Sequence, residues 1–152
     1  MNYSQNRMKK VFYKSKLAKF LLFSSYTTIT LFAWVFTKLA VHEAKQSVVN
    51  HECVHARQWT ELAFSSGLLL WLGVAILGFS AWLLAFAPFA FYIWYALEYV
   101  VRRFLGLFAR SDNRQKEAYR LVSFEQEARL AEEDPNYLEN SMYFAWLKSY
   151  KK

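Results

Sequence analysis

Cysteine, proline and glycine are scarce in this sequence of 152 residues, which has one cysteine, two prolines and four glycines. The single Cys53 cannot form an internal disulfide, so nothing favours a disulfide-stabilised secreted fold. The hydrophobic share of 55% and the aromatic share of 20% exclude a disordered tail, and the low glycine and proline content excludes a collagen-like repeat. The length is typical of a single domain.

Acidic residues are also outnumbered, with 12 Asp and Glu against 19 Lys and Arg, which gives a formal net charge of +7. Residues 1–19 form a leader with six basic side chains and no acidic one, whereas residues 62–101 have one ionisable side chain, Glu98. Basic residues that flank apolar blocks are typical of membrane proteins, whereas nucleic-acid-binding proteins arrange theirs as a stripe or patch. We therefore expect the lipid bilayer as a partner, and no nucleic acid.

The segment at 20–42 is apolar but rich in threonine and serine. Its part at 20–37 has the minimum length of a membrane-spanning helix. The part from Thr27 to Thr37 suits a β-strand equally well, because β-branched and aromatic residues predominate there. Both interpretations stay open at this point.

The block at 62–101 is too long to be one membrane helix. A helix of this length would measure about 60 Å, twice the hydrocarbon thickness of a bilayer. Gly78 and Pro88 offer breaks, and we place the turn of a membrane helical hairpin at Phe86–Pro88. A helix over 43–61 precedes this hairpin.

The part at 111–152 has a soluble character. Asp112 suits the N-cap of a helix that runs to Glu133 and ends at Asp134-Pro135. A last helix is predicted from Tyr137 to Tyr150. The fold class that follows is mainly α, in one domain, with or without a short N-terminal β-hairpin or strand.

The residues His51-Glu52-Cys53-Val54-His55 form an HExxH motif within the predicted helix at 43–61. Positions i and i+4 project from one helix face, so His51 and His55 can hold one metal ion. Two imidazoles with an oxygen ligand suit zinc, which activates a water at its open position. Glu52 lies close enough around the helix to act as the general base. Cys53 faces away and is predicted to pack in the core.

A third ligand is needed, and no histidine follows His55. The acidic candidates are Glu98, Glu125 and Glu127. Glu125 is the predicted ligand because it lies in the middle of an apolar stripe, where a carboxylate is costly unless paired or metal-bound. The apolar residues of this stripe are Ala118, Leu121, Val122 and Ala128. Glu127 falls on the opposite face, where an ordinary surface carboxylate belongs.

Several other polar residues have open roles. Gln58 is either a supporting partner of the metal site or a solvated side chain. Glu98 is expected to form an ion pair with Arg102 or to support the site, and Glu127 is kept as a further supporting candidate. His42 is predicted to lie on the surface.

The HExxH motif followed by Phe124-Glu125-Gln126-Glu127-Ala128 resembles the membrane-bound gluzincin metallopeptidases, which include the CAAX-prenyl endopeptidases and the BlaR-type sensor proteases. In their pattern E-x-x-A-[D/N] the first Glu is the third zinc ligand, which corresponds to Glu125. Arg129 stands where that pattern has Asp or Asn. A closer likeness, over roughly residues 26–148, is to a group of small bacterial HExxH proteins. In gluzincins a strand precedes the metal helix, which favours the strand interpretation of Thr27–Thr37.

Topology adds a constraint on any shared metal site. His51, His55 and Glu125 must lie on one side of the membrane, which a hairpin between them allows. The basic leader and the arginines after the hairpin favour the cytoplasmic side. The sequence therefore predicts a membrane zinc metallopeptidase that hydrolyses a peptide or protein substrate. The alternative is a zinc-binding or vestigial membrane protein that binds a partner without catalysis.

Overall fold

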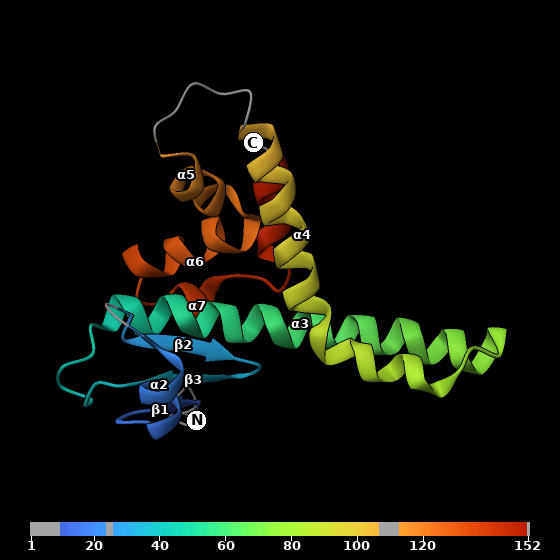
Figure 1. Ribbon diagram of the computed structural model, residues 1–152, viewed down its shortest axis with the longest axis horizontal. Coiled ribbons are helices and arrows are strands. Elements are labelled where there is room, and N and C mark those ends of the chain that lie inside the picture. The colour runs from blue at the N-terminus through green and yellow to red at the C-terminus, as the bar shows by residue number, and fades with distance from the viewer. Residues whose placement is uncertain (1–9, 24–25, 107–112, 152) are drawn as a thin grey trace. The chain divides into compact units, whose positions relative to one another are not determined.

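The computed structural model of the chain (Figure 1) describes residues 10–23, 26–106 and 113–151. It is mainly helical, with 70% helix and 8% strand, as the sequence predicts. Asp112, the expected N-cap, lies outside the described residues, and so do residues 1–9 of the basic leader.

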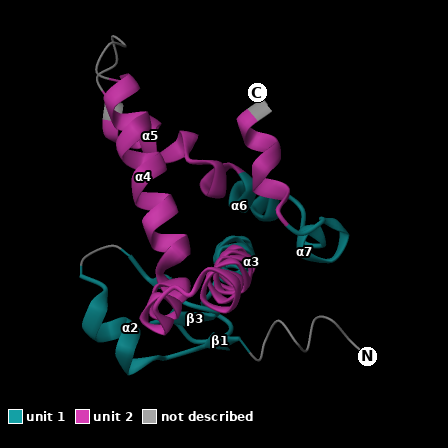
Figure 2. Ribbon diagram, turned by 90° about the vertical axis from the view of Figure 1, so that its right-hand side faces the viewer, with its two compact units in different colours: residues 1–57, 127–143 teal, residues 58–126, 144–152 magenta. Residues whose placement is uncertain are grey.

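The chain divides into two compact units, which are coloured separately in Figure 2. The first comprises residues 1–57 and 127–143, and the second comprises residues 58–126 and 144–152. Each unit is described below by itself.

The first unit contains a small sheet in the order β1-β3-β2. Strands β2 (Thr28–Leu31) and β3 (Trp34–Thr37) form an antiparallel hairpin, and β1 (Val11–Phe12) pairs with β3 in parallel. The strand interpretation of Thr27–Thr37 is therefore right, and a spanning helix over 20–37 is wrong. The threonines of this segment, with Ile29 and Val35, are β-branched and suit a pleated, half-buried surface.

A short helix, α2 (Lys16–Leu21), follows β1 in the first unit. Ser15 caps its N-terminus through a hydrogen bond from the Ala18 amide at 3.4 Å. Backbone hydrogen bonds from Lys14 to Leu39 and from Ser15 to Thr37 fix the start of α2 beside β3. This helix was not predicted, since residues 16–19 fall in the basic leader and residues 20–21 in the apolar segment at 20–42.

The core of the first unit includes one face of the helix that carries the HExxH motif. Val11, Val35, Val49, Cys53 and Ala56 form one buried cluster. Cys53 is 6% exposed, so its predicted packing role is confirmed.

Helix α3 (Gln46–Leu77) is longer than the predicted helix over 43–61. It runs without a break from the HExxH motif into the apolar block, because no proline interrupts it and glycines at 67 and 73 are tolerated within it. The helix is therefore continuous across residues 61 and 62 and carries both the motif and the first apolar arm.

The second unit contains the helical hairpin, but its turn is not at Phe86–Pro88 as predicted. The turn lies at Gly78, whose φ of +69° is in the left-handed region that favours glycine. Pro88 lies near the end of a 3-10 segment, η1 (Ala81–Phe89), which continues directly into α4 (Ala90–Leu105). A proline just before the first turn of an α-helix costs little, because the N–H groups at that end have no partner within the helix.

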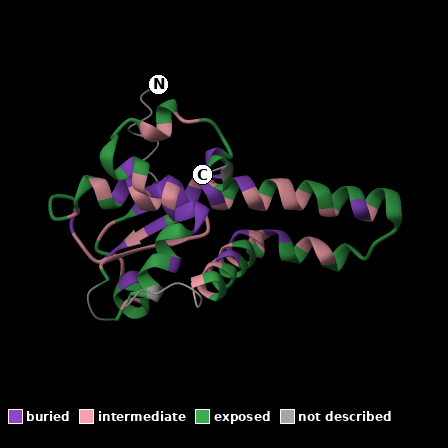
Figure 3. Cartoon of the chain, turned by 90° about the horizontal axis from the view of Figure 1, so that it is seen from above, coloured by how far each residue is buried: buried purple, intermediate pink, exposed green. Residues whose placement is uncertain are grey.

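The hairpin arms approach closely through small side chains and are joined by side-chain hydrogen bonds from Trp59 and Ser66. A Cβ placed on Gly67 would lie 3.6 Å from the Cβ of Ala87. The Trp59 indole donates a hydrogen bond to the Pro88 carbonyl at 2.7 Å. Most side chains along the arms are exposed or half-buried (Figure 3), and both Gln46–Leu77 and Ala81–Leu105 are long and apolar enough to cross a membrane.

The C-terminal part differs from the predicted pair of helices. Helix α5 (Arg114–Leu121) is separated from α6 (Ser123–Glu133) by Val122, whose ψ of 129° is extended. The Glu98 carboxylate accepts hydrogen bonds from the amide and the hydroxyl of Ser123 and so caps the start of α6. The predicted continuous helix to Glu133 is wrong at this break, whereas its end before Asp134-Pro135 is confirmed.

The predicted last helix from Tyr137 to Tyr150 is also interrupted. Helix α7 (Tyr137–Asn140) and the 3-10 segment η3 (Ala145–Lys151) are separated by non-helical residues. One of these, Phe144, has a positive φ of 58°, which a continuing right-handed helix does not allow.

Candidate metal centre

The two histidines of the motif face one another on α3. Their Nε2 atoms are 3.1 Å apart, and the rings are nearly perpendicular, at 81°. His55 is 7% exposed, and His51 is partly buried. The spacing of four residues thus gives the common face that the sequence predicts.

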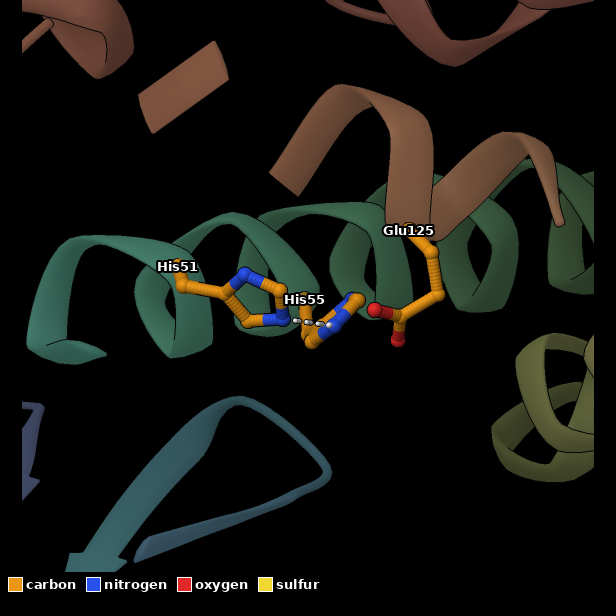
Figure 4. A group of neighbouring side chains, drawn as sticks. All are labelled: His51, His55 and Glu125. Atoms are coloured by element: carbon orange, nitrogen blue, oxygen red, sulfur yellow. Dashed lines mark hydrogen bonds between the residues drawn. The ribbon is translucent and has the colours of Figure 1, made fainter. Parts of the chain in front are cut away.

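Glu125 of α6 neighbours these two histidines, as Figure 4 shows. One ligand atom from each of His51, His55 and Glu125 lies within 4.8 Å of the others, and Glu125 is 2% exposed. The structure therefore brings together the three residues that the sequence selects as metal ligands.

This donor set fits a zinc ion. Zinc is held by His nitrogen and carboxylate oxygen, and tetrahedral bonds of about 2.1 Å place ligand atoms about 3.4 Å apart. The 3.1 Å between the two Nε2 atoms is near that spacing. Three protein ligands leave the fourth position that a catalytic zinc site keeps open.

Two residues of the second unit hold the Glu125 side chain and the backbone just before it. The Tyr95 hydroxyl donates a hydrogen bond to Glu125 Oε1 at 2.9 Å. Gln58 is fully buried, and its Nε2 donates to the carbonyl of Phe124 at 3.1 Å. Gln58 thus positions the residue before Glu125, and the interpretation of Gln58 as a solvated side chain is wrong.

Glu98 of α4 holds the start of α6, the helix that carries Glu125. Its predicted ion pair with Arg102 is confirmed at 3.5 Å. In addition, Glu98 is 8% exposed and accepts hydrogen bonds from Ser123 and from the Tyr150 hydroxyl at 2.7 Å. It contributes to the site by fixing the start of α6, two residues before Glu125.

A carboxylate that the sequence analysis missed contacts His51. The Nδ1 atom of His51 is 2.6 Å from Glu132 Oε1. If Nδ1 carries the proton and donates it to Glu132, the Nε2 lone pair is available to a metal. Glu132 follows Glu125 by seven residues, which returns it to nearly the same helix face, and this spacing was the available signal. Arg129 occupies the position where the gluzincin pattern places its own supporting residue.

Glu127 is buried rather than solvated, so the prediction of a surface carboxylate is wrong. It is 1% exposed and accepts a hydrogen bond from the Arg57 guanidinium at 2.5 Å. Arg57 also donates to the Ser141 hydroxyl at 2.8 Å and lies 5.8 Å from the centre of the Tyr137 ring. The prediction placed Glu127 opposite the apolar face of one continuous helix. Because the helix breaks at Val122, residues before and after the break do not share such a face.

Tyr137 completes this cluster on the other side of Glu127. Its hydroxyl lies 3.4 Å from Glu127 Oε1. Burial, with the neighbouring Glu127 charge as a lesser cause, raises the pKa of Tyr137 to about 12. The Arg57–Glu127 cluster is thus a charged, structural core of the first unit.

Glu52, the predicted base, is held by the sheet. The Thr30 hydroxyl of β2 lies 2.6 Å from Glu52 Oε2, and it also lies 2.9 Å from the Glu52 backbone carbonyl. Thr30 is a second residue that the sequence analysis missed, because nothing in the motif specifies which strand residue faces it. His42, as predicted, is on the surface, with its side chain 81% exposed.

Comparisons of the chain with models of known protein families, with curated proteins and with solved structures give no match. The likeness to gluzincins therefore stays a prediction from the motif residues.

Proposed function

We propose that this chain is a membrane zinc metallopeptidase in which His51, His55 and Glu125 hold the metal. The observation that carries the proposal is the grouping of their ligand atoms within 4.8 Å. Glu52 follows His51 directly in α3, where a general base of an HExxH enzyme is expected. The donor set alone would accept other divalent metals, so zinc is part of the proposal.

The membrane part of the proposal depends on helix α3. The apolar arm begins at Leu62, about 10 Å along the helix axis from His55. If α3 and Ala81–Leu105 cross as a hairpin, the histidines lie close to the bilayer surface, and residues on either side of the hairpin share one compartment. Lysines before α3, together with Arg102 and Arg103 after the hairpin, favour the cytoplasmic side.

The chain's own residues have distinct tasks in the proposed hydrolysis. A zinc ion bound here would polarise the scissile carbonyl and lower the pKa of water. Glu52 removes a proton from the attacking water as the oxygen–carbon bond forms, and it delivers that proton to the amine nitrogen as the carbon–nitrogen bond breaks. Thr30 orients the Glu52 carboxylate, and Glu132 and Tyr95 hold His51 and Glu125.

Replacing the base tests this mechanism. Glu52→Gln keeps the size of the side chain but cannot accept the proton, so we expect cleavage of a membrane-protein-derived peptide library to fall by at least about 100-fold. Zinc measured by mass spectrometry should stay near one ion per chain. Glu133→Gln, at an exposed acid, is the matched control and should leave both values unchanged. Undiminished cleavage by Glu52→Gln would refute the mechanism.

One contact favours a second candidate, a zinc-binding module that recruits a partner without catalysis. The 2.6 Å hydrogen bond between Thr30 and Glu52 is one that a purely structural carboxylate would also make. In that case the wild-type chain binds zinc but cleaves nothing in the library, and the only effect of Glu52→Gln is a lower free energy of unfolding. The same two measurements therefore distinguish the candidates.

A further inference from the structure

Helix α2 belongs to the first unit (Figure 1). It combines exposed apolar side chains with exposed lysines. Phe20 is 75% exposed, and Phe23, just after the helix, is 80% exposed. Leu17 and Leu21 are exposed as well, at 41% and 40%. A helix of six residues is unstable alone, so its position depends on Ala18, its one buried residue, and on the backbone bonds to β3.

The arrangement around the helix axis separates these side chains by type. At about 100° per residue, Phe20, Leu17 and Leu21 cover one arc of about 100°. Lys16 and Lys19 lie together beside the Phe20 edge of that arc, whereas Ala18 lies beside the Leu21 edge. Such a pattern is typical of a helix that lies in a membrane interface, with its apolar arc among the acyl chains and its lysines at the headgroups.

The charge of the surrounding segment indicates which lipid it would contact. The first 42 residues contain no Asp or Glu, and Lys14, Lys16 and Lys19 are all exposed. Anionic headgroups attract clustered lysines near a membrane surface, and salt screens this attraction. A zwitterionic surface offers no such net attraction.

We propose that α2, with Phe23, is an interfacial anchor that binds the surface of an anionic bilayer and is separate from the two spanning helices. The Leu17, Phe20, Leu21 and Phe23 side chains enter the headgroup–acyl boundary, and Lys16 and Lys19 contact the lipid phosphates. The inference depends on the proposed membrane location, but not on the metal site or on catalysis.

A fluorescent label on the full-length chain tests the anchor. An environment-sensitive label is attached to Phe20→Cys, and the matched site is Glu133→Cys, at an exposed acidic position. The wild-type chain, whose Cys53 is buried, measures background labelling. Each protein is reconstituted in vesicles of phosphatidylcholine alone or with phosphatidylserine, and some vesicles also contain brominated lipid. In vesicles with phosphatidylserine, we expect brominated lipid to quench the fluorescence of the label at position 20 at least about threefold more than at position 133. High salt, or the double variant Lys16→Gln/Lys19→Gln, should abolish this difference.

Three results would overturn the anchor. Equal quenching at the two positions would mean that α2 stays in water. Equal quenching at position 20 with and without phosphatidylserine would exclude recognition of anionic lipid. A blue shift at position 20 without lipid quenching would show that a protein surface, such as a second copy, covers α2. A chain that does not float with the vesicles would instead refute the membrane location itself.

Discussion

The buried carboxylates of Glu125 and Glu127 lie two residues apart in α6, yet their surroundings differ in kind. Arg57 places a permanent positive charge against Glu127, and Tyr137 and Ser141 complete that cluster. Beside Glu125 lie the Tyr95 hydroxyl and the two imidazoles of the HExxH motif. A buried acid is thus built into the core by a cation from the chain in one case, and in the other it lies among the donors of a proposed metal site. The two cases should respond differently to mutation and to metal.

The largest effect is expected from breaking the Arg57–Glu127 pair. Arg57→Ala leaves the Glu127 charge buried, and we expect it to lower the free energy of unfolding by about 3–5 kcal/mol, measured by denaturation in detergent. The double variant Arg57→Leu/Glu127→Leu should recover most of this loss, because it removes both charges. A loss below about 1 kcal/mol for Arg57→Ala would contradict a structural role for the pair.

The zinc affinity of the His51, His55 and Glu125 group should respond to a change that leaves these three residues intact. Glu132→Gln weakens the contact with His51 Nδ1, and we expect zinc affinity to fall by about 10–100-fold in a competition titration with a chelator. Glu133→Gln changes the adjacent, exposed acid and should leave the affinity unchanged. If the two variants bind zinc equally, Glu132 does not position His51.

A smaller, pH-dependent effect is expected from Tyr137 in the Arg57–Glu127 cluster. Because the folded-state pKa of Tyr137 is raised from 10 to about 12, its contribution to stability is present below pH 10 and is lost as the pH rises toward 12. Tyr137→Phe should flatten the decline in unfolding free energy over that interval, whereas Tyr26→Phe, at an exposed ring, should not. An equal alkaline decline in wild type and Tyr137→Phe would exclude this cause.

Local patterns predicted much of the fold and of the candidate site. The His51–His55 face follows from helical geometry alone, and the β-branched run before it indicated a strand as one of two open interpretations, which the hairpin of β2 and β3 decides. The mainly helical fold and the end of α6 before Pro135 followed in the same way. Each of these depends on residues that are close in the sequence.

Two of the wrong predictions depend on residues that are far apart in the sequence. Val122 breaks the helix where Glu98 caps Ser123, and Arg57 neutralises Glu127 from 70 positions away, so neither could be read from periodicity. The hairpin turned at Gly78 rather than Pro88 because a positive φ reverses the chain there, whereas a proline early in a helix does not. Thr30 and Glu132 were missed because a motif gives ligands but not the residues that orient them.

Zinc content in a matched pair of isosteric variants tests the central claim most directly. The account predicts about one zinc ion per chain in the wild type, a near-complete loss in Glu125→Gln, and a value near one in Glu127→Gln. Both substitutions remove one negative charge from buried positions two residues apart in α6. Because Glu127→Gln also breaks the ion pair with Arg57, zinc is measured on protein whose circular dichroism spectrum shows that each variant is folded. Zinc retained by Glu125→Gln, or lost from Glu127→Gln alone, would contradict the assignment of Glu125 as the third ligand.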